Sequence, residues 1–371
     1  MVEWKKLGEV CEIGTGSNNR EDACDNGCYP FYVRSQEVLK IDSYSYDEEA
    51  ILIPGEGGIG DIFHYINGKY GLHQRTYRVH PITGDVKGRY IYYFLFANFK
   101  IYINAKSYKS TAASIRKPML LDFPIPIPSL EEQTRIVGIL DTFTSAIDNL
   151  KEQIAQRRKQ YEYYRDQLLD LEGKPGVEMK TLGEVCEIKG RIGFRGYTRE
   201  DQVEEGEGVI SLSPGNIENG QMVYKGCTYI TWEKYEESPE IKTYDGDILF
   251  CKTGSTVGKV AMVKELPCEA TINPQLVVLK NITIDSKFLN YILGTYTIQS
   301  TVKRLAGVGS VPNISQEKLG NLKIPLPPLQ EQQRIVSILD TFEASIQNLE
   351  AQLKEREKQY EYYRNKLLTF E

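Results

Sequence analysis

Two glycine-rich segments have the residue types and spacing that could bind a phosphate. Residues 51–60 read ILIPGEGGIG, an apolar run followed by glycines in the pattern G-x-G-x-x-G. In dinucleotide-binding loops this spacing lets the backbone approach a pyrophosphate at a helix N-terminus. Residues 254–259, GSTVGK, resemble a phosphate-binding loop but have three residues between the glycines where that loop has four. Either match alone has little specificity, so the neighbouring residues must decide.

The residues that follow each glycine segment argue against nucleotide binding. A dinucleotide-binding loop opens a helix, but residues 61–71 contain two further glycines. Residues 260–263 read VAMV, which is typical of a β-strand, and Val260 replaces the Ser or Thr of a phosphate loop. We therefore predict a strand, a glycine loop and a strand in both places. Such a loop can still lie close to a phosphate or a base edge, because glycine has no side chain.

Other signatures of catalysis and metal binding are missing from the sequence. It contains no HExxH, DxDxDG or GxSxG motif, and no Asn/Asp-Pro-Pro-aromatic motif of an amino-methyltransferase. Three histidines and seven scattered cysteines do not favour a zinc site, and we expect free thiols in a reducing cytoplasm. No apolar run is long enough for a membrane span, and the first residues lack a signal-peptide core. The sequence therefore predicts a cytoplasmic protein without catalytic residues, metal or cofactor.

The charge is unevenly distributed along the chain. The net charge of −6 is unusual for a protein that binds nucleic acid. Residues 86–121, however, contain seven basic residues, interleaved tyrosines and no acid, and residues 286–316 also lack acids. Such segments can present a locally basic surface to phosphates. The alternative is a chance cluster of basic residues around a buried helix.

The chain is a tandem duplication. LGEVCEI occurs at 7–13 and again at 182–188, and residues 130–172 share 26 of 43 positions with residues 329–371 without a gap. Because the intervening segments have diverged, we divide the chain into a first variable block (1–129), a first repeated block (130–172), a second variable block (173–328) and a second repeated block (329–371). In this alignment the two glycine segments occupy equivalent positions, which indicates one shared turn.

Each repeated block is predicted to be one long helix. Apolar residues recur in steps of four and three, the spacing of a coiled-coil seam, and Ser129 with Glu132 fits a capping box at the first helix start. The seam residues are Ile136, Leu140, Phe143, Ile147, Leu150, Tyr161 and Tyr164 in the first copy and Ile335, Leu339, Phe342, Ile346, Leu349, Tyr360 and Tyr363 in the second. About 40 residues at ~1.5 Å each give a rod of roughly 60 Å. We expect the two helices to pair antiparallel, with the tyrosines as packing residues.

The variable blocks are predicted to be mixed α/β domains. Apolar and β-branched runs predict strands at 30–35, 50–54, 73–79, 208–213, 247–252, 260–263 and 271–279. Helices are predicted at 89–103 and 287–306, each before the proline-rich entry to a long helix. The predicted fold class is therefore α+β: two mixed α/β domains separated by two long antiparallel coiled-coil helices, with pseudo-two-fold symmetry.

These features together resemble the specificity subunit of a type I restriction–modification system over the whole chain. The most specific motif is Ile-Pro-x-Pro-x-Leu-x-Glu-Gln, which begins each repeated block at 125–133 and 324–332. LGEVCEI at both block starts, the segment 246–258 and GVGSVPNIS at 307–315 also match. The first block departs from the last of these, because residues 110–118 read STAASIRKP.

The resemblance implies a division of labour between subunits. Each variable block would be a target-recognition domain that reads one half of a split, asymmetric sequence in double-stranded DNA. The two helices would set the gap between the halves and dock two methyltransferase subunits, and restriction (motor) subunits would join for cleavage. The chemistry, and with it S-adenosylmethionine, ATP and magnesium, would belong to those partners.

Base readout requires side chains such as Arg, Lys, Asn and Gln at a groove edge. In the first block the candidates for DNA contact are Arg34, Gln36, Gly57, Gly58, Gln74, Arg75, Lys106, Lys109 and Arg116. In the second block they are Arg191, Arg195, Asn216, Lys252, Gly254, Ser255, Lys259, Asn273, Gln275 and Ser310. Two other functions compete: a scaffold that uses only the coiled coil, and an enzyme in its own right. A further alternative is that the chain serves a different kind of system, such as a fused restriction–methylation enzyme that uses the same kind of recognition subunit.

Overall fold

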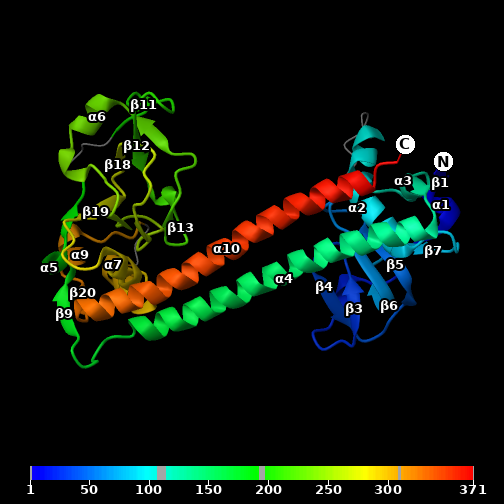
Figure 1. The fold of residues 1–371 in the computed structure, drawn as a ribbon, viewed down its shortest axis with the longest axis horizontal. Coiled ribbons are helices and arrows are strands. Elements are labelled where there is room, and N and C mark those ends of the chain that lie inside the picture. Colours follow the sequence, from blue (N-terminus) through cyan, green and yellow to red (C-terminus); the bar gives the residue numbers. More distant parts are fainter. Residues whose placement is uncertain (1, 107–113, 192–196, 308–310, 371) are drawn as a thin grey trace. The chain divides into compact units, whose positions relative to one another are not determined.

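The computed structural model describes residues 2–106, 114–191, 197–307 and 311–370, with only the backbone for Lys106. The chain divides into two compact units: unit 1 is Met1–Ile154 with Leu349–Glu371, and unit 2 is Ala155–Asn348. Each unit therefore contains one variable block and part of both long helices. The variable block of unit 1 is blue to cyan in Figure 1, and that of unit 2 is green to yellow.

Unit 1 is built on a six-stranded sheet with the order β2-β7-β5-β6-β3-β4. Its elements are β1 (Glu3–Lys6), α1 (Leu7–Val10), β2 (Cys11–Thr15), η1 (Arg20–Asp22), β3 (Tyr29–Tyr32), β4 (Val38–Ile41), β5 (Tyr46–Pro54), β6 (His64–Leu72), β7 (Thr76–Pro81), α2 (Gly88–Lys106), α3 (Lys117–Leu121) and β8 (Pro124–Ile127). Neighbouring strands are antiparallel except β3 and β6, which are parallel. The sheet curls on itself, because Asn18 N beyond β2 donates to Leu72 O at the end of β6 (3.2 Å).

The central strand β5 is buried on both faces, which explains its continuous apolar run. Ile51 and Ile53 face the main core of unit 1, whereas Ala50 and Leu52 face a second cluster around Tyr70. Helix α2 covers the main core with the buried aromatic residues Tyr90, Tyr93, Phe94 and Phe99. Helix α4 (Leu130–Leu169) completes this core with Ile136 and Leu140, and Leu368 joins it directly after the end of α10 (Leu329–Leu367).

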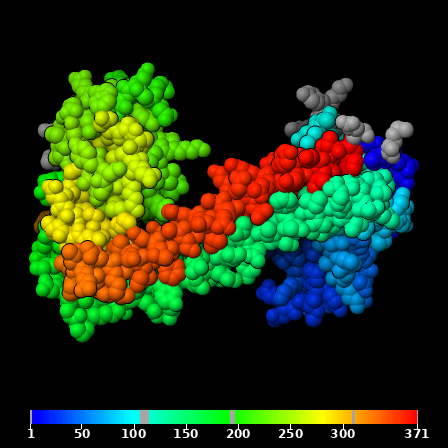
Figure 2. Space-filling view, viewed as in Figure 1, coloured from blue at the N-terminus to red at the C-terminus, as the bar shows by residue number. Residues whose placement is uncertain are grey.

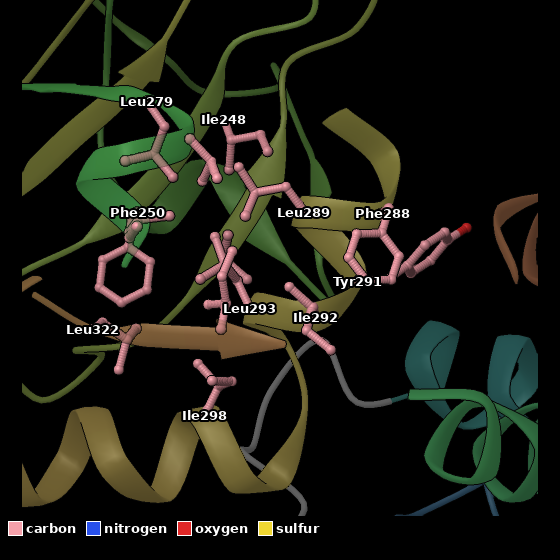
Figure 3. Packing of buried hydrophobic residues seen from close by; sticks show 14 of the residues in the cluster. Ile248, Phe250, Leu279, Phe288, Leu289, Tyr291, Ile292, Leu293, Ile298 and Leu322 are labelled. Atoms are coloured by element: carbon pink, nitrogen blue, oxygen red, sulfur yellow. The ribbon is translucent and has the colours of Figure 1, made fainter. Parts of the chain in front are cut away.

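Unit 2 contains two four-stranded sheets, β10-β19-β16-β17 and β11-β15-β12-β18. Its elements are β9 (Glu178–Thr181), α5 (Leu182–Val185), β10 (Glu187–Lys189), β11 (Gln202–Val203), β12 (Val209–Leu212), η2 (Pro214–Asn216), β13 (Ile217–Glu218), β14 (Gln221–Met222), β15 (Thr228–Ile230), α6 (Trp232–Glu236), η3 (Pro239–Ile241), β16 (Ile248–Cys251), β17 (Val260–Met262), β18 (Ala270–Ile272), β19 (Leu276–Lys280), α7 (Ser286–Leu293), α8 (Tyr296–Ala306), α9 (Gln316–Gly320) and β20 (Lys323–Leu326). Helix α7 packs on the first sheet, where Leu289 lies beside Ile248 in a cluster that also includes Phe288 and Leu279 (Figure 3).

The sheet β10-β19-β16-β17 repeats the order β2-β7-β5-β6 of unit 1. In unit 1, Val79 pairs with Ile13 on one side and Ile51 on the other. In unit 2, Leu279 pairs in the same way with Ile188 and Ile248. The predicted equivalence of the two glycine segments is therefore confirmed, since each follows an equivalent strand (β5 or β16) and connects it to an antiparallel strand, as predicted.

The ends of each variable block are joined by a two-stranded sheet. β1 pairs antiparallel with β8 in unit 1, and β9 pairs antiparallel with β20 in unit 2. The sequence missed these strands, because the proline-rich entry was interpreted only as a helix start. Proline is tolerated there because it donates no hydrogen bond and each of these strands has a single partner.

The long helices α4 (Leu130–Leu169) and α10 (Leu329–Leu367) pair antiparallel, as predicted. In unit 1 the start of α4 packs against the end of α10 (Figure 2). There Phe143 stacks on Tyr363 with ring centroids 5.2 Å apart. In unit 2 the end of α4 packs against the start of α10, where Tyr164 stacks on Phe342 at 5.5 Å. Arg356 over Phe143 and Arg157 over Phe342, both at 5.8 Å, complete the repeated register. The tyrosines are therefore packing residues.

The Gln of the helix-entry motif attaches each long helix to its variable block. Gln133 Nε2 donates to Asp85 O (2.8 Å) and Pro128 O (2.9 Å), and its Oε1 accepts from Lys87 N (2.9 Å). Gln332 bonds Pro327 O and Asp285 N in the same manner. Ser129 does cap α4 by accepting from Glu132 N (3.2 Å). The reciprocal half of the predicted capping box is absent, because the Glu132 carboxylate pairs with Arg135 instead.

Two predicted elements are each broken into two. The predicted strand 271–279 is β18 and β19, because Pro274 has no N–H and Asn273 begins a turn. The predicted helix 287–306 is α7 and α8, because Gly294 ends the first helix and Thr295 has an extended backbone. The strands predicted at 30–35 and 73–79 are shorter: β3 ends at Tyr32 and β7 begins at Thr76.

Candidate nucleic-acid interface

In unit 1, three connecting segments meet at one place. They are the residues after β3 (33–36), the glycine loop between β5 and β6 (55–63) and the turn between β6 and β7 (73–75). His73 N donates to Tyr32 O (3.0 Å), and Gly55 N donates to Arg75 O (2.9 Å). The His64 ring bonds Ser35 O through Nε2 (3.1 Å). These bonds fix the backbone on which the polar side chains of the first block lie.

Two arginines share one carboxylate at this site. Arg34 Nη1 and Arg75 Nη1 both donate to Glu56 Oε2, at 3.1 Å and 2.8 Å. Hydrogen bonding from Arg75 is the main reason why the pKa of Glu56 lies below its usual value. A surface pocket of about 250 Å³ adjoins the cluster, lined by Arg20, Val33, Arg34, Ser35, Glu56, Gly57 and His73. The cluster carries more positive than negative charge, which suits an electron-rich base edge or a phosphate.

Unit 2 has the same backbone frame. Lys252 N donates to Gln275 O (2.9 Å), as Gly55 N does to Arg75 O. Asn273 N donates to Leu212 O (2.8 Å), as His73 N does to Tyr32 O. The frame therefore places position 275 of unit 2 where position 75 lies in unit 1.

A third bond extends the match to the segment after the block helices. Ile314 N donates to Lys252 O (2.9 Å), and Ile115 N donates to Gly55 O (2.8 Å). Ile115 is therefore the equivalent of Ile314, although the sequence around it (110–118) departs from the family pattern.

The turns at 73–75 and 273–275 are closed by different side chains in the same way. In unit 1, Arg75 N donates to His73 Nδ1 (3.0 Å). In unit 2, Gln275 N donates to Asn273 Oδ1 (3.0 Å). Both are turns in which a side chain accepts a backbone N–H two residues ahead. His73 and Asn273 are therefore occupied in holding the turn.

Other polar residues surround the glycine loop of unit 2. Thr253 Oγ1 donates to Asn313 Oδ1 (2.7 Å), and Gly254 N donates to Pro312 O (2.9 Å). Lys259 Nζ donates to Ile217 O (2.9 Å), so its charge lies between the glycine loop and η2. Ser255 is exposed at the loop tip.

The structure brings together some candidate residues and separates others. Arg34, Gly57, Gly58 and Arg75 share one site in unit 1, and Lys252, Gly254, Ser255, Lys259, Asn273 and Gln275 share the equivalent site in unit 2. Gln74 bonds Asn19 Oδ1 (2.7 Å) at the edge of the first site, while Gln36 and Arg116 are exposed. Lys109, Arg195, Ser310 and the Lys106 side chain lie outside the described residues.

Asn216 and Arg191 have structural contacts instead. Asn216 is 5% exposed; its Oδ1 accepts from Ser213 N and its Nδ2 donates to Val223 O. Arg191 is 8% exposed, and its Nε donates to Ile272 O (3.0 Å). Burial therefore removes both side chains from a DNA surface.

The acid-free segment 86–121 is partly neutralised by the fold. Arg89 Nε donates to Asp141 Oδ1 of α4 (2.8 Å), and Lys100 Nζ bonds Asp61 Oδ1 (2.5 Å). Lys117 and Arg116 are exposed. The buried helix α2 therefore accounts for part of this cluster, as the alternative interpretation expected.

Sequence reasoning missed Arg20, Glu56 and His73. Glu56 lies inside the glycine segment, where the motif directed attention to the glycines.

All seven cysteines are free. Within the described ranges, no group of three or more His, Cys, Asp or Glu could hold a metal ion. None of the described helices is both long and apolar enough to cross a lipid bilayer.

The family model for the type I restriction modification DNA specificity domain matches residues 1–157 and 175–357, one copy in each half of the chain. The chain belongs to this family. A putative type I restriction enzyme specificity subunit of Haemophilus influenzae is 30% identical over 393 aligned positions, covering 100% of this chain and 96% of that protein. The EcoDI specificity subunit of Escherichia coli is 27% identical over 95% of this chain and 84% of its own length.

Solved structures of specificity subunits share the fold. The S subunit of a type I system from M. genitalium superposes with a TM-score of 0.66 at 17% identity, covering 100% of this chain and 97% of that one. A chain from a study of complex assembly in the type I system gives 0.60 at 18% identity, over 99% and 96%. As a specificity subunit, this protein serves DNA target specificity and is a non-catalytic component of a restriction–modification system.

Acidification should destabilise unit 1 of this specificity subunit but not unit 2. Burial lowers the pKa of His64 below its ordinary value of 6.5, and burial also lowers the pKa of His73, helped by the positive charges of Arg34 and Arg75. The unfolded chain therefore takes up protons at a higher pH than the folded chain, so stability present above pH 6.5 is lost as the pH falls through the folded pKa values.

The second unit provides the control, because all three histidines lie in the first variable block. Urea unfolding at a series of pH values, with proteolytic fragments assigned to each unit by mass spectrometry, would measure the difference. An equal loss of stability in both units between about pH 6.5 and 5.5 would contradict the prediction.

Proposed function

We propose that this specificity subunit reads a two-part, asymmetric sequence in double-stranded DNA, with one half read by each unit. The observation that carries the proposal is the repeated backbone frame with unlike side chains: Arg75 in one unit and Gln275 in the other. Two equal frames suit two separate segments of duplex. Different side chains on them suit two different half-sites, because base edges are read by side-chain hydrogen bonds.

We further propose that two methyltransferase subunits, and restriction subunits with them, bind to this chain in the cytoplasm. The long helices support this, because Tyr163 and the equivalent Tyr362 are 59% and 60% exposed. Exposed aromatic side chains are typical of protein interfaces. Since the two tyrosines lie at equivalent places in the two units, two copies of one partner fit better than one.

The test is a methylation map of the source genome with and without this gene. We expect methylation to disappear at one split, asymmetric motif and at no other. That result would establish the two-part target and supply its sequence. An unchanged map would contradict the proposal and favour a scaffold that uses only the coiled coil.

A further inference from the structure

We propose that Arg75 and Gln275 are the equivalent base-reading residues of the two units, Arg75 selecting a guanine and Gln275 an adenine at the same position of their half-sites. This inference rests on the proposed function and assigns it to particular side chains. Arginine pairs bidentately with guanine O6 and N7, and glutamine with adenine N6 and N7. The same backbone frame can thus recognise either guanine or adenine, depending on which side chain it carries at this position.

The backbone of this position is fixed on both sides in each unit. Arg75 N donates to His73 Nδ1 and Arg75 O accepts from Gly55 N. Gln275 N donates to Asn273 Oδ1 and Gln275 O accepts from Lys252 N. Since both backbone groups are satisfied within the fold, only the side chain is left to contact DNA. The Arg75 side chain is 56% exposed, and Gln275 is exposed.

A neighbouring group orients each of the two side chains. Glu56 Oε2 accepts from Arg75 Nη1 (2.8 Å), and Asn273 Nδ2 donates to Gln275 Oε1 (3.2 Å). The bond to Glu56 leaves Nε and Nη2 of Arg75 for a base, and the bond from Asn273 uses one lone pair of Gln275 Oε1, which leaves its second lone pair and Nε2. Glu56 and Asn273 are therefore positioning residues, which reduce the rotamer freedom lost on binding.

The adjacent glycine loop leaves room for a base edge beside the reading side chain. Gly57 and Gly254 lie two residues after the equivalent Gly55 and Lys252, and both have positive φ. A Cβ atom at Gly254 would lie 3.4 Å from Gln275 Nε2. A larger side chain there would therefore crowd the group that reads the base.

Other polar positions lack this equivalence. Arg34 lies two residues after Tyr32, and the residue two after the equivalent Leu212 is Pro214, which has no side-chain donor. His73 and Asn273 are committed to closing their turns. Of the polar positions described at these two sites, 75 and 275 therefore combine an equal backbone with an exposed polar side chain.

The experiment exchanges the two residues in the full chain, expressed with its partner subunits in the source strain, and maps methylated motifs. R75Q should change one base pair of one half-site from G·C to A·T, and Q275R should make the reverse change in the other half-site. We expect discrimination at that base pair to shift by about 5- to 150-fold, the range for one bidentate contact. The unaltered half-site serves as an internal control for folding and assembly.

Two further variants separate base reading from plain electrostatics. K40Q removes one exposed charge on β4 of the same unit and should leave the motif unchanged. R75K keeps the charge but lacks the planar fork, so we expect it to weaken the guanine preference without moving it to adenine, because lysine can still donate to guanine O6 and N7. Retention of the motif by R75K and R75Q, with weaker methylation at all sites, would overturn the inference and indicate a phosphate contact. A wild-type map without any split motif would instead overturn the proposed function.

Discussion

Replacing Gln332 by leucine should lower the free energy of unfolding of unit 2 by about 3 kcal/mol. Gln332 is 3% exposed, accepts from Asp285 N (3.1 Å) and donates to Pro327 O (2.8 Å). Leucine has a similar volume but no polar atom, so both backbone groups would stay buried without a partner. Each such group costs roughly 1–3 kcal/mol.

The adjacent glutamine provides a matched control. Gln333 is exposed on the same turn of α10, so Q333L should change the free energy of unfolding by less than about 0.5 kcal/mol. Urea denaturation of both variants, with hydrogen exchange resolved to α7 and β19, would measure the difference. Equal stability of Q332L and Q333L would show that the motif glutamine does not attach the helix to its block.

The second large effect is expected from Gly16→Ala in unit 1. A Cβ atom at Gly16 would lie 1.9 Å from Leu72 O and 2.3 Å from the carbonyl carbon of Leu72. These are backbone atoms of the strand that closes the sheet, so they cannot rotate away. We expect a loss of about 3 kcal/mol from the resulting strain and displaced strand.

Gly84 is the appropriate comparison for Gly16. Neither glycine has a positive φ, and a Cβ atom at Gly84 would meet no heavy atom within 4 Å. Gly84→Ala should therefore leave the stability unchanged or raise it slightly, by reducing the freedom of the unfolded chain. Thermal unfolding of both variants tests the comparison, and a Gly16→Ala protein as stable as Gly84→Ala would disprove the steric argument.

The architecture could be predicted well from the sequence because each pattern occurs twice in the chain, so that the reading of one copy could be checked against the other. The 4-3 spacing identified both long helices, and the contacts of Phe143 with Tyr363 and of Tyr164 with Phe342 repeat as expected. The glycine segments were placed correctly between strands. By contrast, Pro274 was included in one continuous predicted strand and Gly294 in one continuous predicted helix, although each residue interrupts its element.

The site was harder to predict because its parts are distant in sequence. His73, Gln74 and Arg75 were included in a predicted strand, and the turn is visible only in the structure, where Arg75 N donates to His73 Nδ1 and Thr76 N donates to His73 O. The equivalence of Arg75 with Gln275 is visible only in their backbone hydrogen bonds to Gly55 and Lys252, because the sequences around the two positions do not resemble each other. Burial of Asn216 depends on its contacts with Ser213 and Val223, whereas its residue type alone suggested DNA contact.

The paired strands at the block ends also bear on how such genes change. β1 with β8, and β9 with β20, bring the entrance and exit of each variable block to neighbouring backbone positions. The repeated segments LGEVCEI and RIV-ILDTF flank these joints in both halves. A genetic crossover within the repeats would therefore transfer the body of a block with one strand of its joint (β8 or β20), which would pair with the β1 or β9 already in place. New recognition domains could be acquired by recombination in one event, without redesign of the helices that carry them.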